Sequence, residues 1–135
     1  MFDPYRRPTV AVVGAGISGC TAAAECAFSG FDTTLFDRQE YIGGHLTAPD
    51  APTVSRRQHF RTPYLKLTTT DGTPRSLIAH LEAAVDASGA TFRGGAEVTG
   101  AEWNAEEGQW EVSYTRSGET RTELFDVLIL SLIHI

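Results

Sequence analysis

Two patterns of hydrophobic and polar positions follow each other in the first forty residues. A short apolar run rich in β-branched residues, TVAVV at 9–13, is typical of a buried parallel strand. The small-residue segment at 17–29, ISGCTAAAECAFS, favours a helix that ends before Gly30. DTTLF at 32–36 repeats the strand pattern. A strand, a helix and a strand within residues 9–37 predict a right-handed βαβ unit with parallel strands.

The pattern changes several times after this unit. Residues 38–72 have no clear period and contain several prolines, which predicts a ligand-covering loop with at most a short strand at 65–69. Apolar positions at three- and four-residue steps behind a Thr-Pro pair predict an amphipathic helix at 73–89. Two turn-rich segments divide 97–125 into a predicted antiparallel three-stranded β-meander, and a final buried strand follows at 126–130. The predicted fold class is therefore α/β, a Rossmann-like parallel sheet with a β-meander.

Composition and charge argue against several kinds of binding partner. The chain has 135 residues, 41% of them hydrophobic, and a net charge of −6, which argues against nucleic acid or an anionic membrane as the partner. No apolar run approaches the roughly 20 residues that a membrane span needs. Cys20 and Cys26 are too few for a metal site and point to different faces of one helix. We expect a cytoplasmic protein without a metal, and the excess of arginine over lysine hints at a bacterial source.

A glycine motif joins the first predicted strand to the first predicted helix. GAGISG at 14–19 is G-x-G-x-x-G, and its place between a strand and a helix is what gives the pattern meaning. Gly14 allows a tight turn, Gly16 lets the backbone approach a pyrophosphate, and Gly19 lets the helix pack closely on the strand. The free N–H groups of the helix N-terminus attract phosphates. The motif predicts a dinucleotide-binding site.

Asp37 completes this predicted site. It follows the second strand directly, 23 positions after Gly14. A carboxylate at this place accepts hydrogen bonds from the ribose hydroxyls of a dinucleotide. NAD and FAD sites share this fingerprint, so the spacing does not choose between them. The sequence shows neither a Ser/His/Asp set nor a carboxylate pair, and the catalytic residues remain unassigned.

The segment around the motif resembles a family. VAVVGAGISGCTAAAECAFSGFDTTLFDRQEYIGGH at 10–45 resembles the N-terminal FAD segment of flavoproteins with two dinucleotide-binding domains. In these proteins a basic residue and then a Gly-Gly pair follow the ribose carboxylate, as Arg38 and Gly43-Gly44 do here. EVTGAEWNAEEGQWEV at 97–112 resembles the meander of the flavin-containing and Baeyer–Villiger monooxygenases. The resemblance spans most of residues 8–130.

The resemblance implies a function and a set of site residues. The parent enzyme would be a flavin monooxygenase with FAD as its cofactor, NADPH or NADH as co-substrate and a small molecule as substrate. The glycine motif would line the pyrophosphate, Asp37 would bind the adenosine ribose, and Arg38 would lie on the adenine side. Val98 would contact adenine through its backbone, and the Gly-Gly pair would lie near the flavin. The implied cofactor-binding residues are Gly14, Gly16, Ile17, Ser18, Gly19, Asp37, Arg38, Gly43, Gly44, His45 and Val98.

One departure from the family leaves alternatives open. His45-Leu46-Thr47 stands where those monooxygenases usually carry a tryptophan, and a GG-His-x-Thr sequence looks like some amine-oxidase and desaturase-type flavoproteins. His45 is either a flavin-proximal group or an ordinary loop histidine. The parent is accordingly a flavin monooxygenase or an amine-oxidase-like or desaturase-like flavoprotein. A third hypothesis is a stand-alone, non-catalytic dinucleotide-binding module.

The C-terminal residues depart from the family as well. Its final strand continues into an Ala-Thr-Gly-type turn over FAD, where this chain has LSLIHI at 130–135. CTG TCT CTT ATA CAC ATC encodes this string and resembles the transposon-end adaptor of short-read sequencing libraries. We expect residues 130–135 to be adaptor-derived and residues 1–129 to be a partial FAD-binding domain. An incomplete domain of this kind is expected to be inactive alone.

Overall fold

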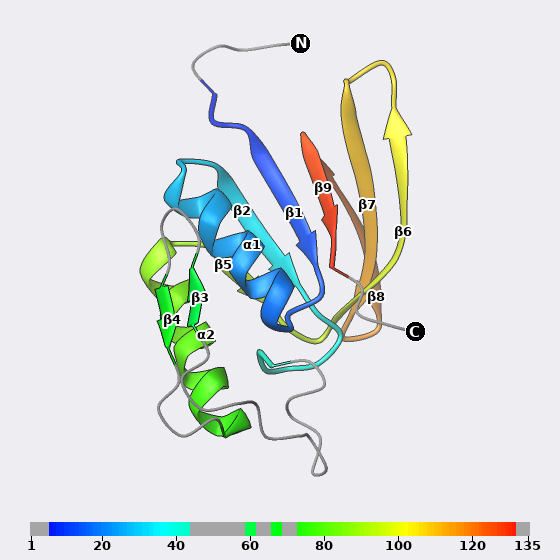
Figure 1. Cartoon of the computed structure of the whole chain (residues 1–135). Coiled ribbons are helices and arrows are strands. Elements are labelled where there is room, and N and C mark those ends of the chain that lie inside the picture. Colours follow the sequence, from blue (N-terminus) through cyan, green and yellow to red (C-terminus); the bar gives the residue numbers. More distant parts are fainter. Residues whose placement is uncertain (1–5, 44–58, 62–65, 69–72, 132–135) are drawn as a thin grey trace.

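The computed structural model describes residues 6–43, 59–61, 66–68 and 73–131 (Figure 1). The elements in chain order are β1 (Thr9–Val13), α1 (Ile17–Phe28), β2 (Asp32–Phe36), β3 (His59–Arg61), β4 (Lys66–Thr68), α2 (Pro74–Ser88), β5 (Thr91–Arg93), β6 (Ala96–Asn104), β7 (Gln109–Arg116), β8 (Glu119–Phe125) and β9 (Val127–Leu130). None of the helices in these ranges is both long and apolar enough to cross a membrane.

The described elements form three layers. A parallel four-stranded sheet, in the order β5-β2-β1-β9, lies between two helices and an antiparallel three-stranded meander of β6, β7 and β8 (Figure 1). Side chains alternate along a strand, so Val10 and Val12 of β1 pack in the core with the helices, whereas Ala11 packs against the meander. Burial on both faces explains why β1 reads as a nearly continuous apolar run. The predicted α/β fold class is confirmed.

Each end of the two helices lies within one residue of its predicted position, because Thr73 and Gly89 are the caps of α2 and Ser29 is the C-cap of α1. After α1, Gly30 has φ +96°, its N–H donates to the Ala27 carbonyl, and the Phe31 N–H donates to the Cys26 carbonyl. These two bonds form a Schellman motif. Before α2, the Thr73 side chain accepts a hydrogen bond from the Ser76 N–H at 3.2 Å. α2 buries Leu77, Leu81, Ala84 and Val85, which pack with α1 and β1 in one core.

The predicted meander is also present, beginning one residue earlier, at Ala96. Its inner face contributes Val112, Tyr114 and Phe125 to a second core, which they form with Ala11 and Phe36 of the parallel sheet. Trp103 and Trp110 lie opposite each other on β6 and β7 and form a cross-strand aromatic pair, with ring centroids 5.4 Å apart. The meander is therefore a second layer packed on the sheet.

Two parts of the prediction need correction. The segment 38–72 was predicted as a loop with at most one strand, but it contains two, β3 and β4, which form an antiparallel pair. The last strand begins at Val127 rather than at residue 126. β9 is also less buried than predicted, because it lies at the edge of the sheet among the described residues and exposes Val127 and Leu130. Parallel pairing of β9 with β1 alone leaves one side of this strand uncovered.

Asp126 lies before β9 rather than in it, because its carboxylate and its N–H form hydrogen bonds with residues outside that strand. Its carboxylate accepts hydrogen bonds from both terminal nitrogens of Arg6, at 2.8 and 3.0 Å, from the Thr9 N–H at 2.7 Å, and from the Gln109 amide at 3.2 Å. The Asp126 N–H in turn donates to the Thr9 carbonyl at 3.0 Å. The Arg6 hydrogen bonds and the donors of Thr9 and Gln109 hold the pKa of Asp126 far below its usual range, although burial acts in the opposite direction. Asp126 thus ties the N-terminal segment to the meander.

We expect Asp126→Asn to destabilise the fold by about 1–3 kcal/mol at pH 7, because the donors around the carboxylate lose an ionised acceptor. A lowered folded-state pKa contributes stability above the unfolded value, about 3.9, and this contribution is lost as the pH falls towards the folded value. Urea unfolding should therefore show that the free energies of unfolding of wild type and variant approach each other as the pH falls from about 5 to about 2. Asp86→Asn, at an exposed position on α2, is the matched control. A difference independent of pH would contradict the assignment.

Candidate dinucleotide-binding site

The glycine motif forms the turn between β1 and α1. Gly14 has φ +106°, a left-handed conformation that favours glycine, and its N–H donates to the Phe36 carbonyl at 2.8 Å. A Cβ on Gly19 would lie 1.6 Å from the Gly14 carbonyl oxygen. The first turn of α1 can therefore approach β1 this closely only because position 19 is glycine, as the motif predicts.

Gly16 is the N-cap of α1 and leaves the end of the helix open. Among the described residues no side chain caps this end, and the first turn of the helix has no acidic residue. The first intrahelical bond of the turn runs from the Cys20 N–H to the Gly16 carbonyl at 3.0 Å. The N–H groups of Ile17, Ser18 and Gly19 precede it and belong to the positive end of the helix dipole. A helix end of this kind can accept an anion such as a phosphate, because its N–H groups and its dipole favour negative charge.

Asp37 stands beside this helix end and holds the glycine turn. One carboxylate oxygen accepts from the Ala15 N–H at 3.0 Å, and the other accepts from the Gln39 N–H at 2.8 Å. An ionised carboxylate offers about four acceptor positions, and donors among the described residues use two of them. The sequence predicted a ligand contact for Asp37. The structure adds an organising contact to the turn itself.

Cys20 lies under the turn, with its thiol donating to the Ala15 carbonyl at 3.4 Å. Burial raises the pKa of this thiol to about 12, and the negative charges of Asp37 and Glu82 act in the same direction. Because the thiolate is the reactive form, we expect native Cys20 to resist iodoacetamide at pH 8, while half-buried Cys26 is alkylated slowly. Peptide mapping by mass spectrometry checks this, with urea-unfolded protein as the control. Rapid alkylation of native Cys20 would contradict the buried position.

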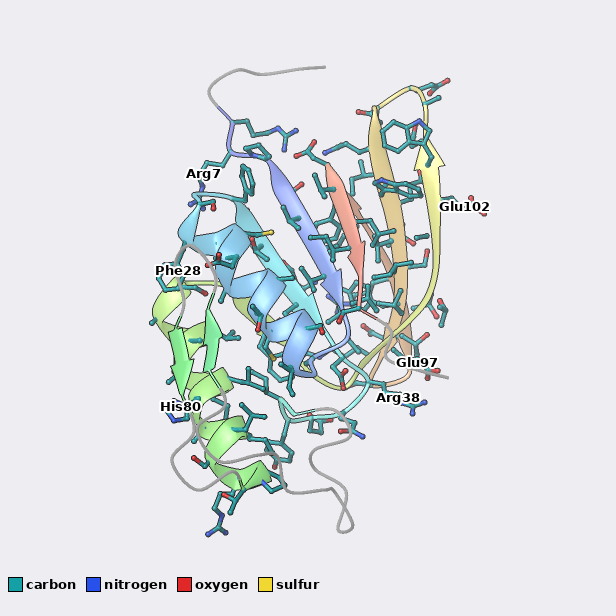
Figure 2. All side chains as sticks on the ribbon, in the orientation of Figure 1. Arg7, Phe28, Arg38, His80, Glu97 and Glu102 are labelled. Carbon is teal, nitrogen blue, oxygen red and sulfur yellow. The ribbon has the colours of Figure 1, made fainter. Side chains whose placement is uncertain are left out.

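The remaining candidate residues divide into three groups. Gly43 comes next to the turn, because its N–H donates to the Ala15 carbonyl at 2.9 Å. Arg38 is exposed, and Val98 is half-buried on β6, two residues beyond Ala96, whose N–H donates to the Asp37 carbonyl at 2.9 Å. Figure 2 shows Arg38 and Glu97, the neighbour of Val98, at the same end of the molecule. Gly44 and His45 lie outside the described residues.

Ser131, one of the residues expected to be adaptor-derived, lies beside the glycine turn in the structure, a position that the sequence analysis did not predict. Its N–H donates to the Val13 carbonyl at 2.8 Å, and a Cβ on Gly14 would lie 2.5 Å from its carbonyl oxygen. Its hydroxyl is buried without a hydrogen-bond partner in the part of the chain that the structure describes. The strand register explains the position of Ser131. Leu130 pairs with Val13, so the next residue must come beside the glycine turn.

An open cavity of about 860 Å³ lies elsewhere, on the meander. The residues lining it are Arg93, Tyr114, Arg116, Ser117, Glu119, Arg121, Thr122 and Glu123. None of these residues belongs to the glycine motif. The open helix end and Asp37, rather than this cavity, therefore define the candidate site.

The described elements form a Rossmann-like fold, with the glycine turn at the carboxyl end of β1 and Asp37 at the carboxyl end of β2. Residues 12–70 match the family model described as NAD(P)-binding Rossmann-like domain. Over 38 residues the chain is also 45% identical to a 4,4'-diapophytoene desaturase of Staphylococcus haemolyticus. This aligned segment covers 28% of this chain and 8% of the desaturase.

Solved structures extend the likeness to nearly the whole chain. The closed structure of a cyclohexanone monooxygenase superposes with a TM-score of 0.68 and 24% identity over 94% of this chain. OTEMO in complex with FAD and NADP superposes with a TM-score of 0.64 and 17% identity over 93% of this chain. The chain spans 26% of the length of each of these two proteins. Likeness at this level of identity shows a shared fold.

Proposed function

We propose that this chain is the FAD-binding part of an NAD(P)H-dependent flavin monooxygenase. The observation that carries the proposal is the open N-terminus of α1 at Gly16, with the carboxylate of Asp37 directly beside it. Such an arrangement suits a pyrophosphate followed by an adenosine ribose. The meander packed on the sheet supports a monooxygenase, because the likeness to cyclohexanone monooxygenase covers 94% of the chain.

The residues present fit this cofactor. The left-handed Gly14 and the uncapped Gly16 leave backbone N–H groups at the helix end for the pyrophosphate, and Asp37 keeps acceptor positions for the ribose. Arg38 and the backbone of Val98 would lie on the adenine side, while Gly43, Gly44 and His45 would lie towards the flavin. FAD supplies the redox chemistry when bound, and this chain's residues hold and orient it. The substrate would be a small molecule, and we propose a cytoplasmic location.

Equilibrium dialysis against FAD and FMN tests the cofactor assignment. FMN lacks the adenosine and the second phosphate, which are the parts that the glycine motif and Asp37 would contact. We expect the chain to retain FAD, and ADP to compete with FAD for the same site. FMN should neither be retained nor compete. Equal retention of both flavins, or of neither, would sink the proposal that this site holds FAD.

The monooxygenase part of the proposal concerns the full product of the gene. We expect that product to consume NADPH and O2 together when a ketone or a nucleophilic heteroatom substrate is supplied, and an oxygen electrode with NADPH absorbance measures both. Oxidation of a substrate without any NAD(P)H would instead favour the second candidate, a desaturase-like or amine-oxidase-like flavoprotein. The identity to a diapophytoene desaturase over 38 residues favours that candidate, although it covers only 28% of this chain.

A further inference from the structure

Three polar side chains meet at the end of the parallel sheet, in the layer between the sheet and the meander. The Arg93 guanidinium of β5 donates to the Tyr114 hydroxyl at 3.0 Å and forms an ion pair with Glu123. The Tyr114 hydroxyl also donates to Glu123, so each of the three side chains contacts the other two. Tyr114 is buried, and the Arg93 side chain is 22% exposed. The cluster therefore fixes β5 to β7 and β8.

The guanidinium also lies over the residue that precedes Asp37. Its central carbon is 5.2 Å from the centroid of the Phe36 ring and 5.6 Å from that of the Tyr114 ring. The Phe36 ring is fully buried and packs against Tyr114, at 5.0 Å between centroids, and against Phe125, at 5.8 Å. A planar cation suits such a position, because it can lie on an aromatic face while its edges donate hydrogen bonds.

The main chain of Phe36 and Arg93 carries the glycine turn and Asp37. The Phe36 carbonyl accepts from the Gly14 N–H at 2.8 Å, and the Arg93 carbonyl accepts from the Asp37 N–H at 3.2 Å. Phe36 and Arg93 are also partners in the pairing of β2 with β5. The same two residues whose side chains stack in the interlayer core thus anchor both halves of the proposed site.

We propose that Arg93 is a positioning residue for the ribose carboxylate of Asp37. The inference rests on the proposed function, in which Asp37 binds the adenosine ribose. Through its ion pair with Glu123 and its contact with the Phe36 ring, Arg93 keeps the end of β2 in one place, and Asp37 projects from that end. Arg93 itself touches no part of the proposed ligand. A lysine would keep the charge but lose the planar surface that lies on the Phe36 ring.

Discrimination between ADP and 2′,3′-dideoxy-ADP tests this role, because the two ligands differ only in the ribose hydroxyls. In the wild-type chain we expect ADP to bind on the order of ten-fold more tightly, by isothermal titration calorimetry, through hydrogen bonds to a charged carboxylate. Arg93→Met should reduce this ratio to about two-fold or less, with an intermediate ratio for Arg93→Lys. Affinity for the dideoxy ligand should change little.

Arg121→Met is the matched control. Arg121 lines the same cavity, but its ion pair, at 2.9 Å, is with the exposed Glu119 of the same strand. This variant should keep the wild-type ratio. If Arg93→Met weakens both ligands equally, or changes neither, Arg93 does not position Asp37 and the inference is overturned. If the wild-type chain itself binds ADP without discrimination, the ribose role of Asp37 in the proposed function fails instead.

Amide hydrogen exchange gives a second measurement that needs no ligand. The Ala15 N–H is protected by its hydrogen bond to Asp37, whereas the Ala11 N–H lies within β1 and reports on the sheet. In Arg93→Met we expect Ala15 to exchange about ten-fold faster relative to Ala11, and in Arg121→Met we expect no relative change. Equal acceleration at both amides would show general destabilisation and would overturn the inference even where the proposed function holds.

Discussion

We expect the Gly19→Ala variant to be strongly destabilised. A Cβ at this position would lie 1.6 Å from the Gly14 carbonyl oxygen and 2.8 Å from its carbon, and both are backbone atoms. They cannot move aside unless α1 separates from β1, and the Cys20 and Ala23 side chains behind them are fully buried. We expect the free energy of unfolding, measured with urea, to fall by about 3 kcal/mol or more. This loss is a large part of the 5–15 kcal/mol that is typical of a domain.

Gly100→Ala is the matched control for this loss. Gly100 lies in β6, and a Cβ there would meet no atom within 4 Å. The free energy of unfolding of Gly100→Ala should differ from that of the wild type by no more than about 0.5 kcal/mol. If the Gly19→Ala variant unfolds cooperatively and with a free energy of unfolding close to that of the wild type, the contact between α1 and β1 does not require glycine at position 19.

Gly16→Val is expected to separate binding from folding. Gly16 has φ −85° and ψ −161°, an extended conformation open to any residue, so the backbone gives no reason for the chain to unfold. A branched side chain at the N-cap would instead occupy the position that the pyrophosphate needs. We expect FAD affinity to fall on the order of 100-fold, measured by equilibrium dialysis, while the melting temperature changes little.

Two further variants make this result specific. Gly16→Ala adds a smaller side chain and should weaken FAD binding less, and Gly100→Val makes the same change in open space and should leave binding intact. Unchanged flavin retention by Gly16→Val would mean that the turn between β1 and α1 is not the cofactor site. Two glycines of one motif thus have opposite expected effects, one on stability and the other on binding.

Local signals in the sequence were enough for most of the fold. The αL glycines at the ends of α1 and α2, the Thr73 cap and the period-two pattern of the meander each depend on a few neighbouring residues. β3 escaped prediction because three residues, HFR, are too few to show a period. β9 was predicted as buried because its composition is apolar, but its exposure depends on which strands pair with it.

The site was predictable only in its continuous part. The spacing from Gly14 to Asp37 is visible in the sequence, because the motif and the end of β2 belong to one βαβ unit. The cluster of Arg93, Tyr114 and Glu123 was not predictable, since the packing of the meander on the sheet brings these residues together across long separations in the sequence. The hydrogen bonds from Ala15 and Gln39 to Asp37 were not predicted either, because side-chain conformation has no signature in a pattern.

The bonds of Asp37 to the glycine turn have a consequence for the rate of ligand capture. Because the carboxylate already accepts a hydrogen bond from the Ala15 amide, we expect the turn to keep this shape before a ligand arrives. Association should then need no slow rearrangement, and stopped-flow traces should show a single phase whose rate rises linearly with ligand concentration. Differences in affinity between related ligands should appear in how long each stays bound.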